Sequence, residues 1–152
     1  MDEQYAWLYE EEEDRIRAAE EILNRPSLLD REILARSARA ELLRRSANRF
    51  GTRMRKDRVV STPDPTRAQA LLAEAVDEER EAQRLEEERE LAYLTAAEHI
   101  ARVESPEGQK VLELRYLERW TWDAIGAETR YSKAQLFRLR RRGLEEMARP
   151  RT

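Results

Sequence analysis

The stretch TWDAIGAETRYSKAQLFRLRRRGLEEM, residues 121–147, decides how the rest of this chain is interpreted. It predicts two short helices joined by a tight turn, because Ser132 and Gln135 have the spacing of a capping box at the start of the second helix. That second helix carries small and apolar residues at the spacing of one packed stripe, namely Leu136, Leu139, Gly143, Leu144 and Met147. A short helix, a sharp turn and a basic helix are typical of a helix-turn-helix, whose second helix enters the DNA major groove.

The other faces of this helix carry the side chains that we expect to read DNA. Lys133, Ala134 and Gln135 lie in its first turn, which reaches deepest into the groove. Gln135 can bond adenine through its paired donor and acceptor, and Arg138 can form two hydrogen bonds with guanine. A thymine methyl group can be contacted by Ala134 or Phe137.

Three further residues are better placed for the phosphate backbone. Arg141 and Arg142 lie farther along the helix, and Thr121 lies at the N-terminus of the preceding helix. Arg140 falls nearer the packed edge, where pairing with a nearby carboxylate competes with a contact to DNA. A basic helix that is merely solvated is the alternative to this whole interpretation.

The composition favours an all-α protein. Of 152 residues, 40% are charged, whereas glycine, proline and aromatic residues are scarce. The net charge is only −3, but the charge is distributed in blocks. Residues 1–14 and 74–90 are mainly acidic, and residues 36–58 and 130–151 are mainly basic. These blocks can pair within the protein, pair between subunits, or leave the basic segments free for phosphate.

The N-terminal residues 1–50 predict a helical hairpin. A helix over residues 3–23 should stop at Asn24–Pro26, and Ser27 can cap the next helix. The second helix has an apolar seam at heptad-like spacing, interrupted by Arg36, which consists of Leu29, Ile33, Ala40, Leu43, Ala47 and Phe50. Packing within an antiparallel hairpin and packing in a dimer interface would both bury this seam.

The middle of the chain predicts a linker followed by a long helix. Residues 51–66 contain prolines and no hydrophobic period, so we expect a linker there. Its basic residues either lie along the DNA backbone as an arm or are simply solvated; they are Arg53, Arg55, Lys56 and Arg58. Residues 67–104 predict one solvent-exposed spacer helix with a weak coiled-coil tendency, and residues 105–149 predict a three-helix DNA-binding domain.

This last segment resembles region four of bacterial sigma factors. It is more similar to the small phage late transcription activators of the RinA and ArpU type, which are built on the same module. Their pattern is matched by Arg115–Tyr116, Trp122, Ile125, Tyr131, Ser132, Gln135, Phe137 and Arg138. One departure is Arg130, because the turn before Tyr131 usually holds glycine or asparagine, which suit a positive φ. The resemblance implies a phage-encoded regulator of late genes.

The composition argues against most other site chemistry. The chain has no cysteine, which rules out disulfides and thiolate sites and fits the reducing cytoplasm. His99 is the only histidine and has no second ligand nearby in the sequence, so we expect neither a metal site nor a catalytic triad. Glycine-rich phosphate loops and membrane-spanning apolar runs are missing from the sequence as well. We therefore expect no catalytic residue, no cofactor and no membrane association.

Three functions remain in competition. The first is a transcription regulator, cytoplasmic and nucleoid-associated in a bacterial host, which binds double-stranded DNA as a homo-oligomer, with a dimer favoured. The second is a small terminase subunit, which also joins a helix-turn-helix to helical oligomerisation elements. The third is a sigma-like protein that binds host RNA polymerase through its acidic helix. A dimer favours regulation, a large ring favours packaging, and co-purification with polymerase in the absence of DNA favours the third.

Overall fold

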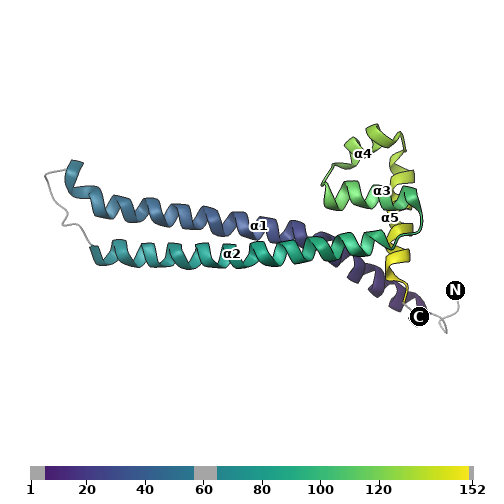
Figure 1. Cartoon of the computed structure of the whole chain (residues 1–152), viewed down its shortest axis with the longest axis horizontal. Coiled ribbons are helices and arrows are strands. Elements are labelled where there is room, and N and C mark those ends of the chain that lie inside the picture. Colours follow the sequence, from purple (N-terminus) through teal and green to yellow (C-terminus); the bar gives the residue numbers. More distant parts are fainter. Residues whose placement is uncertain (1–5, 57–64, 151–152) are drawn as a thin grey trace. The chain divides into compact units, whose positions relative to one another are not determined.

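The protein is all-helical over the residues that the computed structural model describes, 6–56 and 65–150. Its elements in chain order are α1 (Ala6–Lys56), α2 (Pro65–Ala101), α3 (Pro106–Leu112), the π-helical turn η2 (Glu113–Leu117), α4 (Trp122–Thr129) and α5 (Lys133–Ala148) (Figure 1). No strand occurs within the described ranges, so the expected all-α class is confirmed.

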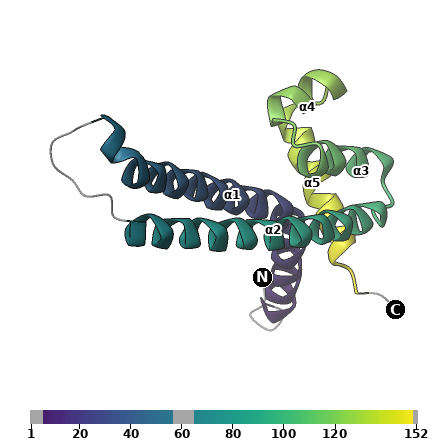
Figure 2. The same ribbon diagram turned by 60° about the vertical axis from the view of Figure 1, so that its left-hand side comes forward.

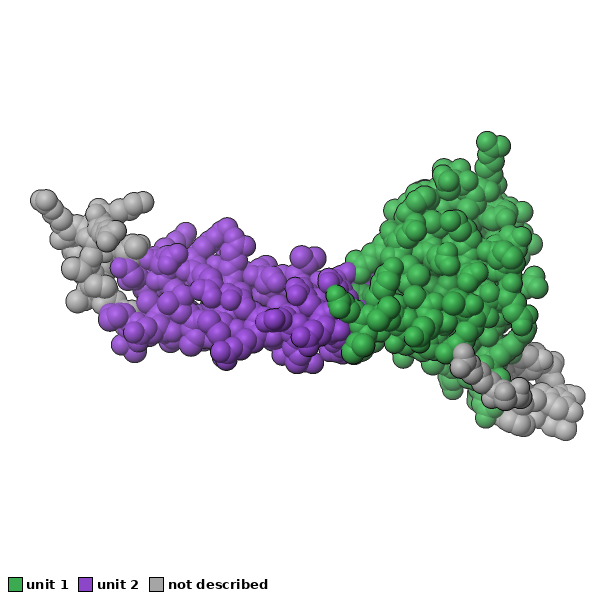
Figure 3. Space-filling model, viewed as in Figure 1, with its two compact units in different colours: residues 1–26, 90–152 green, residues 27–89 purple. Residues whose placement is uncertain are grey.

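The chain folds into two compact units, which Figure 3 colours separately. Unit 1 contains Met1–Pro26 and Glu90–Thr152, and unit 2 contains Ser27–Arg89. Helices α1 and α2 both cross the boundary, so each contributes one segment to either unit. The C-terminal helices therefore share their unit with the first part of α1 and the last part of α2.

Helix α1 runs without interruption through Pro26, so the predicted hairpin within residues 1–50 is wrong. A proline inside a helix removes one backbone hydrogen bond and costs about 3 kcal/mol. Here Pro26 is itself buried, at helical spacing from the buried side chains of Leu23 and Leu29. Because a buried leucine contributes about 1.5–3 kcal/mol, the continuous buried face offsets the cost of the proline.

Helix α1 also continues beyond Gly51 and ends at Lys56, although residues 51–56 are predicted to belong to the linker. A single glycine inside a helix costs only about 1 kcal/mol relative to alanine, which is too little to end a helix that the preceding turns already stabilise. The rest of the predicted linker up to residue 64 lies outside the described residues, and α2 begins at Pro65.

Unit 2 pairs the second part of α1 with the first part of α2, and these segments lie side by side and antiparallel (Figures 1 and 2). Helix α2 contributes Ala75, Ala82 and Leu85, which are only 0%, 6% and 3% exposed and follow a heptad-like spacing. The predicted solvent-exposed spacer helix is therefore wrong for this face of α2. Two of these three buried residues are alanines, which contribute little to the hydrophobic pattern of a charged helix, so the pattern does not reveal the buried face.

Ion pairs accompany the apolar seam of unit 2. Arg36, which interrupts the heptad pattern of α1, finds a carboxylate on α2, and its hydrogen bond with Glu78 raises the pKa of the guanidinium. The hydrogen bonds that join the two helices are Arg36–Glu78, Arg44–Glu79 and Arg89–Asp30, at 3.1, 3.0 and 2.7 Å. The acidic block of α2 therefore pairs with the basic block of α1 within one chain.

Two buried clusters form the core of unit 1. The first joins segments of α1 and α2 to the C-terminal helices and consists of Ile16, Ala19, Leu23, Ala96, Ile100, Val103, Leu112, Leu144 and Met147. The second lies among the C-terminal helices alone and consists of Val111, Leu114, Ile125 and Leu136. Helix α5 contributes to both clusters, so one element connects them.

Gly143 lets α5 approach α3 closely, because a Cβ atom on this residue would lie 2.7 Å from Cδ1 of Leu112. Leu112 is fully buried, so its side chain has little room to move away. We expect Gly143→Ala to lower the free energy of unfolding by about 1–3 kcal/mol, because overpacking outweighs the helix propensity that alanine adds. Denaturant unfolding followed by circular dichroism measures the change.

Gly51→Ala is the matched control, because Gly51 is also helical and a Cβ atom there meets nothing within 4 Å. This variant should gain about 0.5–1 kcal/mol. A comparable gain for Gly143→Ala would contradict the close approach of α5 to α3. Combining Gly143→Ala with Leu112→Ala should cost less than the sum of the two single changes, because the smaller side chain makes room.

Candidate nucleic-acid interface

The interface predicted from the sequence is built on α4, α5 and the turn between them. Thr121 is the N-cap of α4, and its side-chain oxygen accepts a hydrogen bond from the Ala124 N–H at 3.1 Å. This N-cap satisfies one of the free backbone donors of the first helical turn. Ile125 is fully buried and anchors α4 in the second cluster of unit 1.

The turn between α4 and α5 has a left-handed conformation at Arg130, with φ 63° and ψ 17°. The N–H of Arg130 donates to the Gly126 carbonyl at 2.8 Å and closes the end of α4. Thr129 ties the turn together, since its hydroxyl donates to the Ile125 carbonyl at 2.6 Å and accepts from the Tyr131 N–H at 3.4 Å. The turn therefore keeps the positive φ that glycine or asparagine would suit, although arginine occupies the position.

Helix α5 begins with the predicted capping box, which is confirmed. Ser132 Oγ accepts from the Gln135 N–H at 3.2 Å, and Gln135 Oε1 accepts from the Ser132 N–H at 2.9 Å. The predicted packed stripe is confirmed by the buried residues Leu136, Gly143, Leu144 and Met147. Because the cap engages the side-chain oxygen of Gln135, a paired contact of this residue with adenine would require the cap bond to open.

The N-terminal half of α5 exposes a surface that consists of Lys133, Ala134, Phe137 and Arg138, called the reading surface below. Within the described part of the chain, neither Lys133 nor Arg138 forms an ion pair. The Nε atom of Arg138 lies 3.4 Å from the carbonyl oxygen of Ala134, one turn earlier on the same helix. Two positive charges are therefore available to a ligand beside an apolar patch.

Phe137 is held on the reading surface by contacts with the preceding helices. Its ring meets the Trp122 ring edge-on, with 5.1 Å between the ring centroids. The guanidinium of Arg115 lies over the Trp122 ring at 5.0 Å and donates to the Trp120 carbonyl at 3.0 Å. Aromatic and cation–π pairs of this kind each contribute about 0.5–1 kcal/mol. The aromatic ring of Phe137 is thus positioned while 45% of the residue stays exposed.

The C-terminal half of α5 differs, because carboxylates engage its arginines. Arg141 donates to Glu13 of α1 and to Glu145, the latter at 3.1 Å. The hydrogen bond between Arg141 and Glu13 raises the pKa of the guanidinium and lowers the pKa of the carboxyl. The Nε atom of Arg142 lies 3.6 Å from Oε1 of Glu146, and the side chain of Arg142 remains 71% exposed. Of the two predicted phosphate-binding arginines, Arg142 is therefore the more accessible.

Arg140 lies at the packed edge of α5, as expected, and its partners come from two other elements. It donates to the Tyr116 hydroxyl and to Glu20 of α1, both at 2.8 Å. Burial works against the charge, but these hydrogen bonds outweigh burial and raise the pKa of Arg140. The sequence gives no spacing that identifies Glu13 or Glu20 as partners of α5. The opposite charge of the N-terminal block is the one available signal.

The predicted backbone arm lies partly in α1 and partly outside the described residues. Arg53, Arg55 and Lys56 lie in the last turns of α1. Their side chains, and the whole of Arg58, lie outside the described residues.

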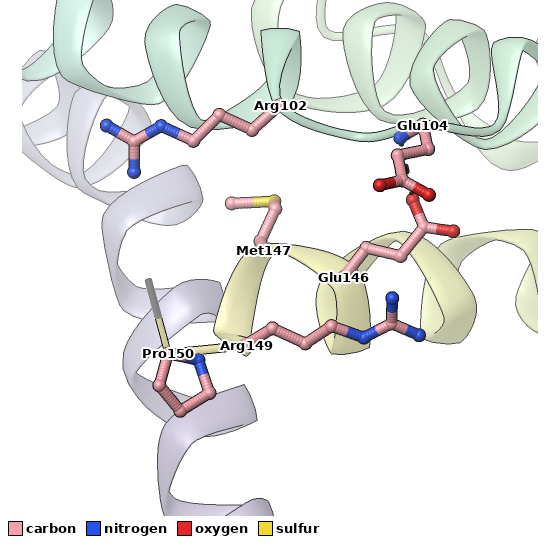
Figure 4. A pocket seen from close by; sticks show the side chains of 6 residues that line it. All are labelled: Arg102, Glu104, Glu146, Met147, Arg149 and Pro150. Carbon is pink, nitrogen blue, oxygen red and sulfur yellow. Dashed lines mark hydrogen bonds between the residues drawn. The ribbon is translucent and has the colours of Figure 1, made fainter. Parts of the chain in front are cut away.

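A shallow hollow of about 220 Å³ lies beside the end of α5 and is lined by Arg102, Glu104, Glu146, Met147, Arg149 and Pro150 (Figure 4). The Glu104 N–H donates to Glu146 Oε2 at 2.8 Å, which ties the connection after α2 to α5. The hollow presents carboxylates and guanidinium groups together. Because the lining carries both charges, it does not select a ligand by its charge. We therefore assign Glu146 a structural role, which is to hold the connection after α2 against α5.

The described ranges contain no group of three or more His, Asp or Glu residues that could hold a metal ion. The Nδ1 atom of His99 lies 2.8 Å from the Thr95 carbonyl, one turn earlier in α2. None of the described helices combines the length and the apolar character needed to cross a bilayer.

Comparison with known proteins identifies no relative of this chain. No family model, no curated protein and no solved structure matches it. The functional interpretation therefore depends on the residues and the geometry described above.

Arg130→Gly should stabilise the protein, because glycine adopts positive φ without the steric cost of a Cβ atom. The left-handed conformation costs a residue with a side chain about 1–2 kcal/mol. Part of this gain is lost to the larger conformational entropy of glycine in the unfolded chain, so we expect a net increase of about 0.5–1 kcal/mol. Thermal and denaturant unfolding measure it. Arg130→Ala is the control and should gain nothing, because alanine keeps the Cβ atom.

Proposed function

We propose that this protein is a sequence-specific, DNA-binding transcription regulator that reads the major groove with residues 132–148. The observation that carries the proposal is the reading surface, which follows a short capped helix across a sharp left-handed turn. A recognition helix of a helix-turn-helix needs such an arrangement, because its first turns must enter the groove while its other face remains packed. The buried stripe of α5 supports this division, as do the exposed side chains of Lys133 and Arg138, which form no ion pair with any described residue.

Base recognition is assigned to the first half of α5. Arg138 can form two hydrogen bonds with the O6 and N7 atoms of guanine, and Ala134 and Phe137 can pack against a thymine methyl group. The edge-on contact with Trp122 fixes the ring of Phe137 before DNA binds, so less side-chain conformational entropy is lost on binding. Lys133 extends the positive charge at the N-terminal end of this surface. Gln135 is assigned to the cap first and to adenine only when the cap opens.

Phosphate contacts are assigned to both sides of the reading surface. The side chain of Arg142 is largely exposed on the C-terminal side. Thr121 caps the N-terminus of α4, where free backbone N–H groups and the helix dipole favour an anion. Contacts of this kind set the register of a protein on DNA but carry no sequence information by themselves.

The biological setting is proposed from the resemblance to phage late transcription activators. It implies a phage-encoded protein acting on late genes inside a bacterial cell, with host RNA polymerase as a further partner. A homodimer is the proposed assembly, because dimeric helix-turn-helix proteins use two copies to read two half-sites. Three leucines on α1 are accessible to a second copy, since Leu28, Leu34 and Leu42 are 57%, 70% and 62% exposed.

Arg138→Ala and Arg142→Ala should affect DNA binding in different ways. Selection of binding sites from a random duplex library, repeated with each variant, measures both effects. Arg138→Ala should cost about 1–3 kcal/mol and relax the preference at one base pair. Arg142→Ala should weaken all sequences alike and reduce the salt dependence of binding by about one unit. If Arg138→Ala lowered affinity while the preferred site stayed unchanged, the assignment of Arg138 to base reading would be wrong.

The mass of the protein in solution tests the proposed dimer and separates regulation from DNA packaging. Light scattering coupled to gel filtration should give twice the mass of the chain. Leu34→Glu should shift that mass towards the monomer, because it replaces the most exposed leucine among the described side chains of α1 with a charged side chain that a dimer interface would have to bury. Glu41→Gln, an exposed change on the same helix, should leave it unchanged. A large ring would instead favour the packaging function.

A further inference from the structure

We propose that residues 10–20 of α1 act as an internal competitor of DNA, occupying a phosphate-binding arginine of α5 until DNA displaces them. This inference rests on the proposed DNA-binding function and adds a regulatory contact to it. The contact is formed by Glu13, which lies on α1, and Arg141, which lies on α5. The two residues are separated by 128 positions in the sequence, so the contact exists only in the folded protein.

Arg141 lies on the same line of α5 as the reading surface. Ala134, Arg138 and Arg141 follow one another at four- and three-residue spacing, which places them on one face of a helix. Arg138 and Arg141 are separated along the helix axis by only about 4.5 Å. A duplex that contacts Arg138 therefore brings its backbone close to Arg141, where the carboxylate of Glu13 already lies.

The chemistry of Glu13 imitates that of a phosphate group. A carboxylate and a phosphate both accept charge-assisted hydrogen bonds from a guanidinium, and both neutralise its charge. Glu13 belongs to the run Glu10–Asp14, whose five residues are all acidic and exposed. The hydrogen bond from Arg141 lowers the pKa of Glu13 from its ordinary value, because it stabilises the charged carboxylate.

The competing segment is held in place independently of the contact that it makes. Ile16, Ala19 and Leu23 are buried in the first cluster of unit 1, and Glu20 bonds Arg140. The side chains of Glu13 and Arg141 are 53% and 43% exposed, so a phosphate can reach Arg141 without unfolding α1. The apolar anchor therefore keeps the local concentration of the carboxylate high, while the ion pair itself remains exchangeable.

The consequence is a sequence-independent loss of affinity for DNA. Each duplex must displace Glu13 before Arg141 contributes a phosphate contact, and this requirement reduces the sequence-independent part of binding. Contacts of the reading surface with bases are unaffected, because Lys133 and Arg138 form no ion pair within the described residues. Because every duplex meets the same cost, the competitor lowers the affinity for all DNA and leaves the ratio between correct and other sites unchanged.

Glu13→Gln tests the proposal, because it removes the charge and keeps the shape of the side chain. Glu12→Gln is the matched control, since it changes the net charge equally at a neighbouring exposed position. Binding of a mixed-sequence DNA duplex is followed by fluorescence anisotropy over a series of salt concentrations. We expect Glu13→Gln to raise affinity about fivefold or more and to steepen the salt dependence by about one unit. Glu12→Gln should raise it less than about twofold.

A second background makes the result specific to Arg141. In the presence of Arg141→Gln, adding Glu13→Gln should no longer raise affinity beyond the Glu12→Gln control. Equal effects of Glu13→Gln and Glu12→Gln, with wild-type protein still binding DNA, would overturn the competitor and leave the proposed function standing. Failure of wild-type protein and every variant to bind DNA would overturn both. Circular dichroism checks that the fold is retained, as expected for an exposed ion pair.

Discussion

The structure of unit 1 depends on the burial of one stripe along α5. At its N-terminal end Leu136 packs with Ile125 in the second cluster, and at its C-terminal end Leu144 and Met147 pack in the first. A helix fixed at both ends cannot rotate about its axis without exposing one cluster or the other. Because side chains project from a helix at fixed angles, burial of the stripe also determines which residues face outward. The reading surface is thus a consequence of apolar packing on the opposite side of the same helix.

The parts of this arrangement that could be predicted from the sequence are those determined over short distances along the chain. The Ser132–Gln135 capping box, the stripe on α5 and the need for positive φ before Tyr131 all involve residues within one or two helical turns. Local hydrogen bonds and helical periodicity leave few alternatives at such positions. Even so, the cap changes the interpretation of Gln135, because the two lone pairs of its side-chain oxygen already accept hydrogen bonds from the N–H and the hydroxyl of Ser132.

The parts that could not be predicted depend on contacts between distant segments. Pro26 has the local character of a helix stop, yet it lies within a continuous buried face and tertiary packing outweighs the local signal. The sequence does not predict the buried face of α2 for a related reason. Ala75 and Ala82 are small and are surrounded by charged residues, so they produce no clear hydrophobic pattern. The packing role of these alanines can be recognised only when the partner helix is known, since a small side chain permits close helix packing but contributes little to a hydrophobic pattern.

Electrostatics divide α5 into two halves, and its sequence shows only part of the difference, because Arg141 and Arg142 each have a glutamate one turn later whereas Arg138 has none. Arg138 and Arg141 are chemically identical, lie on one face and are separated by less than one helical turn. Their difference arises in part from Glu145, which lies one turn after Arg141 on α5. The other part arises from α1, whose buried residues Ile16 and Ala19 bring Glu13 within hydrogen-bonding distance of Arg141. Neutralisation by a distant carboxylate therefore follows from apolar packing that neither arginine takes part in. It follows that counting basic residues along α5 overstates the charge available to a phosphate backbone, because the accessible charge depends both on the glutamates of α5 and on where the N-terminal segment packs.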